Sequence, residues 1–258
     1  MRIHRLIILA LAITGALISS NRASADPLRL AVAANFIQTA QQLADEFMQR
    51  TDLSVTISSG SSGQLATQVR EGAPFDIFLS ADTQRPEELV SSGLAIASSR
   101  FTYAIGQLVL WRPTTGIPPD EQMLRNGQFA HLALCNPATA PYGAAAIETL
   151  KAWNLYDQLR PRLVVAQSVS QALELIQSGN AELGFVALAQ VSRLKEGKYT
   201  VIPESLYSPL RQDAVLLSRA GENIDARQFM TFLHGPQARD MIRRAGYLTP
   251  NGEQEAAR

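Results

Sequence analysis

The sequence predicts an α/β protein built from two lobes, each of them a mostly parallel sheet flanked by helices. The first observation is an alternation of short apolar stretches with segments whose apolar residues recur at helical spacing. Such alternation is typical of parallel or mostly parallel sheets with helices on both faces. The second observation is length: the 258-residue chain keeps 233 residues after a predicted 25-residue leader. That is enough for two lobes of roughly 100 residues each.

The first predicted unit is a strand over residues 28–33 followed by an amphipathic helix. Phe36, Ala40, Leu43 and Phe47 recur at helical spacing after the strand. The unit repeats twice, with strands over 54–58 and 75–79 and helices over about 62–71 and 83–91. Ligands in such folds bind beyond the carboxyl ends of the strands. We therefore expect the turns after these three strands to lie on one edge of a sheet.

The chain is expected to cross into a second lobe along an apolar strand near residues 103–111. A loop rich in Pro, Gly and Thr follows this strand and ends at Pro119. The same logic then repeats, with strands predicted over 132–135, 163–166, 183–187 and near Val201, and helices over 142–153 and 169–177.

The segment over 213–217 is expected to return to the first sheet. Two last helices, over about 225–234 and 237–245, would then pack on that sheet. These expectations assign residues 26–103 and 213–258 to lobe I and residues 104–212 to lobe II. Two crossings between lobes form a hinge, which allows closure around a ligand.

Residues 1–25 have the three parts of a secretory signal peptide. Arg2 and Arg5 form a basic start, residues 6–18 are apolar, and Ala23-Ser24-Ala25 supplies a cleavage site. A membrane anchor is the alternative, but the apolar run is shorter than the ~20 residues of a spanning helix. No cysteine directly follows the run for lipid attachment. We therefore expect export to the periplasm with cleavage after Ala25.

Charge and cysteine content exclude several classes of protein. Cleavage removes Arg2, Arg5 and Arg22 from the 23 basic residues, which leaves 20 against 23 acidic ones, a net charge of −3. A nucleic-acid or membrane-surface binder would normally carry a basic patch or stripe, and the sequence has none. The single Cys135 cannot form an internal disulfide, and its apolar neighbours predict a small buried side chain rather than a nucleophile.

Five short turns combine small or hydroxylated residues with a predicted helix start, and none has Lys or Arg at its tip. A helix start presents unpaired N–H donors and the positive end of the helix dipole. Each turn alone is explained equally well by ordinary helix capping. Several of them on one edge of two lobes predict a receptor for an oxyanion, held without formal positive charge. The turns are Ala33-Ala34-Asn35, Ser61-Ser62-Gly63, Ser80-Ala81-Asp82, Pro141-Tyr142-Gly143 and Ser168-Val169-Ser170.

Six segments of the sequence together carry a family resemblance. They are 31–36 (AVAANF), 58–65 (SSGSSGQL), 72–82 (GAPFDIFLSAD), 136–143 (NPATAPYG), 168–173 (SVSQAL) and 179–184 (GNAELG). Together they resemble the periplasmic molybdate-binding proteins of ABC importers. The resemblance covers essentially the whole mature chain and keeps the order of the motifs. It implies a type II periplasmic-binding fold that holds a tetrahedral dianion, molybdate or tungstate, between two lobes by neutral donors.

The resemblance also implies site residues and partners. The family's ligand contacts fall on Ala34, Asn35, Ser62, Ala81, Tyr142 and Val169. Tyr142 could donate from its side chain or from its backbone. Ala187 stands where the best-known members have a ligand-contacting tyrosine, so that hydroxyl is missing here. No enzyme activity, cofactor or direct protein–metal bond is implied. The implied protein is a monomer that delivers its ligand to a membrane permease with a cytoplasmic ATPase.

Other readings remain open from the residues alone. Sulfate has the charge and hydrogen-bonding type of molybdate. Phosphate carries a proton near neutrality and needs an acceptor, for which Asp76 and Asp82 are the nearby candidates.

Alternatives from other classes of protein also remain open. A secreted hydrolase could use Ser61 or Ser62 as nucleophile, but neither mature histidine, His131 or His234, lies in one of the five turns. The same receptor could also serve a sensor that signals through a partner. No cluster of His, Cys, Asp and Glu suggests a metal site.

Overall fold

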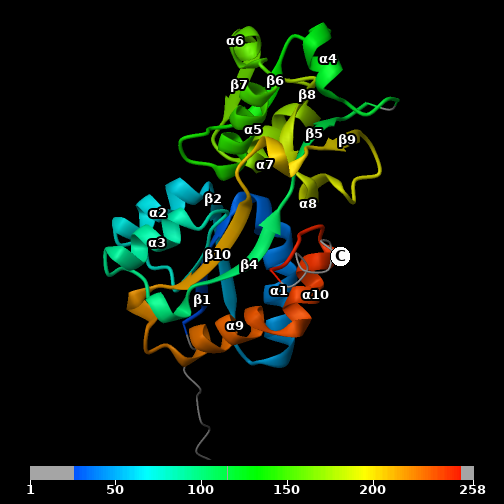
Figure 1. The fold of residues 1–258 in the computed structure, drawn as a ribbon. Coiled ribbons are helices and arrows are strands. Elements are labelled where there is room, and N and C mark those ends of the chain that lie inside the picture. The colour runs from blue at the N-terminus through cyan, green and yellow to red at the C-terminus, as the bar shows by residue number, and fades with distance from the viewer. Residues whose placement is uncertain (1–25, 115, 251–258) are drawn as a thin grey trace, which may run out of the picture.

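The computed structural model describes residues 26–114 and 116–250, so the predicted leader lies outside the described residues. Two five-stranded sheets lie in separate halves of the molecule (Figure 1). The predicted α/β class is confirmed, but each sheet is mixed rather than nearly parallel throughout, because strands that follow the crossings between the halves run antiparallel to their neighbours.

The first sheet has the strand order β2-β1-β3-β10-β4. Its strands are β1 (Leu28–Ala33), β2 (Val55–Gly60), β3 (Ile77–Leu79), β4 (Phe101–Gly106) and β10 (Leu210–Leu216). Helices α2 (Ser62–Arg70) and α3 (Gln84–Ser91) cover one face, and α1 (Ile37–Arg50), α9 (Ile224–His234) and α10 (Pro236–Arg244) cover the other (Figure 1).

Alternation along β1 explains why this sheet has helices on both faces. Leu30 and Val32 join a buried cluster with Phe229 of α9, whereas Ala31 joins a second cluster with Leu65 of α2. Successive side chains of a strand point to opposite faces, so one strand contributes to both clusters.

The second sheet has the strand order β7-β6-β8-β5-β9. Its strands are β5 (Leu108–Arg112), β6 (Leu132–Cys135), β7 (Leu163–Ala166), β8 (Leu183–Ala187) and β9 (Lys198–Val201). The helices of this half are α4 (Glu121–Asn126), α5 (Pro141–Ala152), α6 (Tyr156–Leu159), α7 (Val169–Gln177) and α8 (Leu188–Val191). One continuous buried cluster joins these elements, except for β9 at the edge of the sheet.

The apolar stretch near residues 103–111 forms two strands instead of the single strand expected. β4 pairs with β10 in the first sheet, and β5, which begins after Gln107, pairs with β8 in the second. The boundaries expected at 103/104 and 212/213 fall inside β4 and β10. We therefore place the crossings at Gln107 and just before Leu210. The boundary between β4 and β5 was not predicted because both strands are apolar and buried, so the sequence looks the same on the two sides of Gln107.

Candidate functional site

A small cavity lies where the two halves meet, and all six residues expected to contact a ligand line it. Its volume is about 10 Å³, close to the room that one water-sized sphere needs. None of the lining residues carries a charge. They are Ala33, Ala34, Asn35, Ser61, Ser62, Ala81, Ala140, Pro141, Tyr142 and Val169.

Each lining segment follows a strand end or begins a helix. Ala34 and Asn35 lie in a 3₁₀ turn that spans Ala34–Phe36 directly after β1. Ser62 begins α2, whose N-cap Ser61 forms a capping box with Gln64. Pro141 begins α5 and Val169 begins α7. The sheet topology therefore brings together segments that are far apart in sequence, as expected for the carboxyl edge of parallel strands.

Hydrogen bonds between the halves close the cavity. The Gly63 N–H donates to the Thr139 carbonyl at 2.8 Å, and the Ser170 hydroxyl donates to the Ala34 carbonyl at 3.0 Å. A Cβ atom on Gly63 would lie 3.0 Å from the Thr139 backbone, so the close approach at this point favours glycine. The structure is thus an arrangement in which both halves enclose the same small space.

Backbone donors at the helix starts face no protein acceptor. Within residues 26–114 and 116–250, the N–H groups of Ser62, Tyr142 and Val169 have no hydrogen-bond partner. In α5 the neighbouring N–H groups of Gly143 and Ala144 both donate to the Ala140 carbonyl, which leaves Tyr142 as the free donor of the first turn. Unpaired N–H groups at helix starts form a site for an anion.

The Ser62 side chain is a further donor, and Ala81 determines its direction. The Ala81 N–H donates to Ser62 Oγ at 2.9 Å, and Ser62 is only 1% exposed. Because the oxygen accepts this bond, the hydroxyl proton of Ser62 is left for another acceptor. Ala81 therefore lines the cavity as expected, but its N–H is already used, and its contribution is to orient Ser62.

The side-chain amide of Asn35 is also committed to the protein. Its Nδ2 donates to Gln212 Oε1 at 2.9 Å and to the Tyr247 hydroxyl at 3.2 Å. Both amide hydrogens are thus in use, so a donor from Asn35 to a ligand comes from its backbone. Local sequence carries no signal for these partners, which lie 177 and 212 residues away along the chain.

Tyr142 retains its hydroxyl proton near neutral pH. Burial raises the pKa of this hydroxyl well above its ordinary value, and the nearby Tyr247 and Tyr207 raise it further, while a hydrogen bond from Gln212 lowers it. Gln212 Nε2 donates to the Tyr142 oxygen at 3.3 Å. Tyr142 thus carries both a neutral hydroxyl and a free backbone N–H.

Neither candidate acceptor for a protonated anion lines the cavity. Asp82 accepts from the backbone N–H of Arg85, in the first turn of α3, at 3.0 Å. Asp76 accepts from the Arg29 N–H at 2.8 Å and pairs with Arg219 at 2.9 Å. The cavity is therefore lined by neutral side chains, without a carboxylate.

The small cavity does not bring together the groups that serine hydrolysis needs. No histidine lines the cavity beside Ser61 and Ser62. Cys135 is buried as predicted, and burial raises the pKa of its thiol to about 12. Among residues 26–114 and 116–250, no group of three or more His, Cys, Asp or Glu could hold a metal ion, and no helix is long and apolar enough to cross a membrane.

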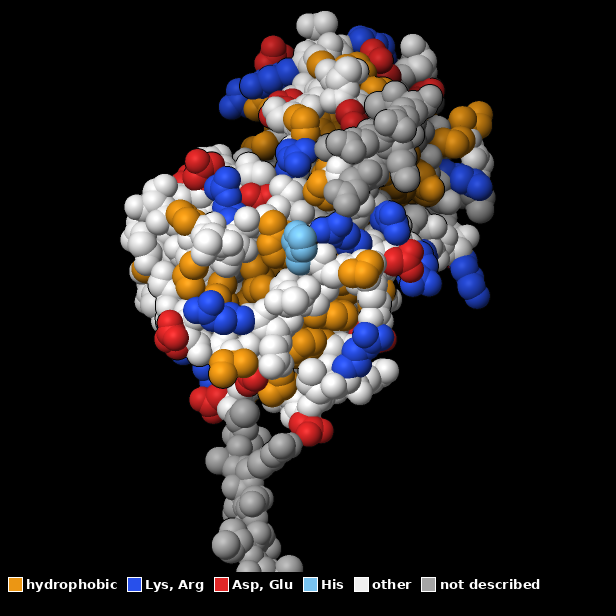
Figure 2. All heavy atoms as spheres, turned by 60° about the horizontal axis from the view of Figure 1, so that its bottom comes forward, with side chains coloured by type: hydrophobic (Ala, Val, Ile, Leu, Met, Phe, Trp, Pro, Cys, Tyr) orange, Lys and Arg blue, Asp and Glu red, His pale blue; other side chains and the backbone are white. Residues whose placement is uncertain are grey.

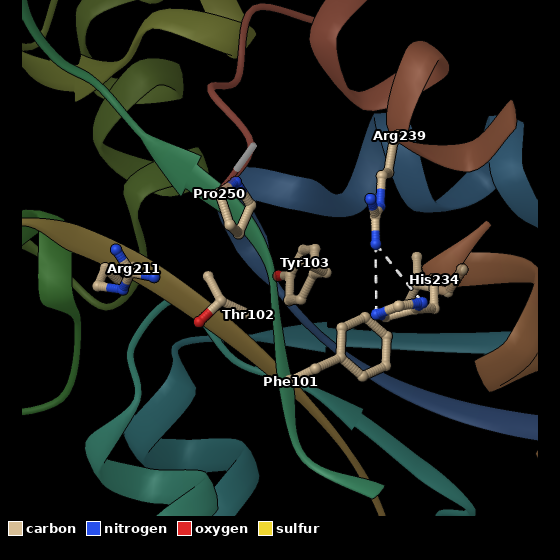
Figure 3. A pocket seen from close by; sticks show the side chains of 8 residues that line it. Phe101, Thr102, Tyr103, Arg211, His234, Arg239 and Pro250 are labelled. Atoms are coloured by element: carbon tan, nitrogen blue, oxygen red, sulfur yellow. Dashed lines mark hydrogen bonds between the residues drawn. The ribbon is translucent and has the colours of Figure 1, made fainter. Parts of the chain in front are cut away.

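A larger cavity of about 310 Å³ lies beside β4 and contains none of the expected site residues. Figure 3 shows Arg239 and His234 pointing toward each other at its wall; an Arg239 guanidinium nitrogen lies 3.3 Å from His234 Nε2. Phe101, Thr102, Tyr103, Arg211, Leu233 and Pro250 complete its lining. On the molecular face in Figure 2, acidic side chains lie among the Lys and Arg side chains.

Comparison with known proteins identifies the family. A family model described as bacterial extracellular solute-binding protein matches residues 28–248. The molybdate-binding protein ModA of Rhodobacter capsulatus is 43% identical over 88% of this chain and 90% of its own length. ModA of Azotobacter vinelandii is 42% identical over 87% of this chain and 91% of its own length.

Solved structures agree with this assignment. The periplasmic molybdate-binding protein of Azotobacter vinelandii superposes with a TM-score of 0.83 and 42% identity, over 86% of this chain and 99% of that one. The sulfate-binding protein SubI of Mycobacterium tuberculosis H37Rv has a TM-score of 0.72 over 87% of this chain and 88% of that one, but only 13% identity, so it shares the fold alone. The expected periplasmic-binding fold and the resemblance to molybdate-binding proteins are both confirmed, and the chain belongs to the bacterial extracellular solute-binding protein family.

Proposed function

We propose that this protein captures molybdate, and also tungstate, between two lobes and delivers it to the permease of an ABC importer. The observation that carries the proposal is the small closed cavity, which both halves line with neutral groups and which no charged side chain enters. The identities of 43% and 42% to proteins named for molybdate binding support the choice of ligand.

The hydrogen-bonding character of the cavity favours an anion without a proton. Free N–H groups and the two hydroxyls of Ser62 and Tyr142 supply donors, and no carboxylate lies among them. Molybdate and tungstate at neutral pH present only acceptor oxygens, so each contact can be a donor–acceptor pair. Hydrogen phosphate would leave its own proton without an acceptor, which costs free energy in a closed site.

The size of the cavity excludes larger ligands. A volume of about 10 Å³ is far below the roughly 300–1,000 Å³ of pockets for drug-sized molecules. A sugar, peptide or amino acid therefore does not fit the arrangement seen here. Sulfate meets the same donor requirement as molybdate, and the distinction between them depends on the exact dimensions of the closed site.

Closure of the lobes would couple binding to transport. We assign the described residues 26–106 and 210–250 to one lobe and residues 107–209 to the other, with the hinge at the two crossings. Donors from both lobes contact the anion together only when the lobes are closed, so the ligand stabilises the closed form. A permease at the inner membrane can then recognise the loaded receptor by its closed shape. The expected leader over 1–25 would bring the protein to the periplasm.

Calorimetric titration of the mature chain, residues 26–258, against molybdate, tungstate, sulfate and phosphate tests the proposal. Tight binding of the first two, with no heat from the others, is the expected result. Tight binding of sulfate or phosphate in place of molybdate would contradict the choice of ligand. Absence of binding by all four anions would contradict the receptor function itself.

A further inference from the structure

Gln212 is a buried polar residue that links the two halves of the molecule beside the cavity. It lies on β10, in the interior of the first sheet, and is 0% exposed. Its Oε1 accepts from Asn35 at 2.9 Å and from the Tyr103 hydroxyl at 3.1 Å. Its Nε2 donates to the hydroxyl oxygen of Tyr142, on α5 of the other half, at 3.3 Å.

The hydrogen-bond partners fix the direction of the protons between Tyr247 and Tyr142. The single proton of Tyr103 has two acceptors, Gln212 Oε1 and the Ser80 carbonyl at 3.0 Å, and this assignment does not depend on it. The Tyr247 hydroxyl lies 2.7 Å from the Asn35 carbonyl, which can only accept, so the Tyr247 proton points there. The Tyr247 oxygen therefore accepts from the Asn35 side chain, and the amide nitrogen of Asn35 must face it. The same nitrogen faces Gln212, so Gln212 has to present its oxygen to Asn35.

The nitrogen of Gln212 consequently faces Tyr142 and can only donate to it. The Tyr142 oxygen accepts this bond, so its own proton must point in another direction. Within the described residues no protein acceptor receives that proton. Tyr142 is only 2% exposed, so solvent offers the proton little access, and Tyr142 is one of the residues that line the small cavity.

Gly106 provides the room for this contact at the end of β4. A Cβ atom at this position would overlap the Tyr142 hydroxyl oxygen and lie 2.7 Å from Gln212 Nε2. The pair of side chains therefore packs directly against the backbone where the chain leaves the first sheet. Close packing on this side keeps the Tyr142 hydroxyl from turning away from Gln212.

We propose that Gln212 is a positioning residue that makes the Tyr142 hydroxyl a hydrogen-bond donor toward the bound oxyanion. The proposal rests on the proposed function, because it concerns the same cavity. Its consequence is selectivity. An amide nitrogen behind the Tyr142 oxygen keeps a proton directed at the ligand, which suits an anion that only accepts. A carboxylate at position 212 would draw the proton back and turn a lone pair of Tyr142 toward the ligand, which suits an anion that carries a proton.

The test is a double-mutant cycle on molybdate affinity, measured by calorimetry with the mature protein. Tyr142→Phe is expected to weaken binding by on the order of 10- to 100-fold, because one donor to a buried charged ligand is lost. Gln212→Glu is expected to weaken it at least as much. In the Tyr142→Phe background, Gln212→Glu should cost much less than in the wild type, because the donor it would redirect is already absent.

Gln212→Met is the neutral control. It removes the bond to Tyr142 and offers only a weakly accepting thioether in place of a carboxylate, so the phenol proton stays available and the loss should be only several-fold. The ratio of molybdate to phosphate affinity is the second readout. It should fall by about tenfold in Gln212→Glu and stay unchanged in Gln212→Met. A residue with a merely structural role would change both affinities together.

If Gln212→Glu does not fold, Gly106→Ala replaces it in the cycle, since the added methyl displaces the Tyr142 hydroxyl. It should weaken molybdate binding in the wild type and much less in Tyr142→Phe. If the wild type binds molybdate and the fold-losses of affinity in the two single variants multiply in the double variant, the two residues act independently. That result would overturn the role of Gln212 and leave the proposed function in place. A wild-type protein that does not bind molybdate would overturn the proposed function, and the role of Gln212 with it.

Discussion

The cavity beside β4 and the cavity between the halves differ both in volume and in the charge of the side chains that line them. The larger one, about 310 Å³, has Arg211, Arg239 and His234 in its wall. The smaller one, about 10 Å³, has no charged side chain. Formal positive charge would point to the larger cavity as the place for an anion, whereas the arrangement of free donors points to the smaller one. The comparison shows that the proposed anion site rests on donor geometry rather than on formal charge.

The physical reason is that backbone N–H groups point in fixed directions and that a site with little water has a low dielectric constant. Hydrogen bonds in a closed site with little water are stronger than in solvent, and each backbone N–H has a fixed direction. A side chain with a formal charge, such as an arginine, attracts many anions through a screened and flexible charge. Fixed neutral donors distinguish anions by their protons and by their size. A receptor that has to reject abundant phosphate gains more from the second arrangement.

The largest effect should come from filling the space at the start of α5. A Cβ atom on Gly143 would overlap the Cys135 carbonyl oxygen, so Gly143→Ala must displace the helix start that carries Tyr142. We expect molybdate affinity to fall by more than ~100-fold and the free energy of unfolding to fall by about 1–3 kcal/mol. Calorimetry and denaturant unfolding measure the two quantities.

Gly60→Ala is the matched control for this change. Its Cβ would meet Leu65 at 3.6 Å, an ordinary contact. Affinity and stability should therefore stay close to the wild type. Full molybdate affinity in Gly143→Ala would mean that the small cavity is not where the anion binds.

A pair of adjacent serines separates ligand binding from helix capping. Ser62→Ala should weaken molybdate binding by about 1–3 kcal/mol, because a buried donor to a charged ligand is lost. Ser61 donates its own proton to Gln64 Oε1 at 2.9 Å and caps α2. Ser61→Ala should therefore reduce stability by about 0.5–2 kcal/mol and change affinity little. Equal losses of affinity in the two variants would remove Ser62 from the set of direct donors.

Molybdate affinity should be nearly independent of pH from about pH 7 to pH 9. No carboxylate, histidine or basic side chain lines the small cavity. The pKa of Tyr142 is raised by burial, so its donor is retained throughout this range and is lost only as pH rises through that raised value. Titrations at several pH values measure this. A decline between pH 7 and pH 9 would show that a titrating group elsewhere takes part.

The smallest effect is expected in the larger cavity. Arg239→Ala removes a guanidinium that contacts the His234 ring, without touching the small cavity. Molybdate affinity should change by less than about twofold, since screening weakens a distant exposed charge. Calorimetry on this variant and the wild type measures the change. A tenfold loss would reverse the comparison and place the anion beside β4.

Local signals in the sequence were sufficient to predict which segments line the small cavity. Ser61, Pro141 and Ser168 mark the starts of three helices, and the alternation of strands and helices places those starts on one edge. These signals depend on neighbouring residues, so the sequence alone reveals them. The resemblance to a known family then selected the same residues.

The use of each donor could not be predicted in the same way. Whether Asn35 and Ala81 offer free donors depends on contacts with Gln212, Tyr247 and Ser62, which only the folded chain brings close. The split between β4 and β5 was missed for a related reason. Both strands are apolar and buried, so only their different sheet partners separate them.

The position of β10 inside the first sheet also constrains the order in which the protein can form. β10 pairs with β3 on one side and β4 on the other, yet it follows the entire second half in sequence. During synthesis β4 has no neighbour in its sheet until residues 210–216 emerge, and such distant pairing slows folding. We expect a chain truncated before Leu210 to show no protease-resistant first sheet; a resistant one would contradict this. A nearly complete nascent chain would thus still lack its native first half.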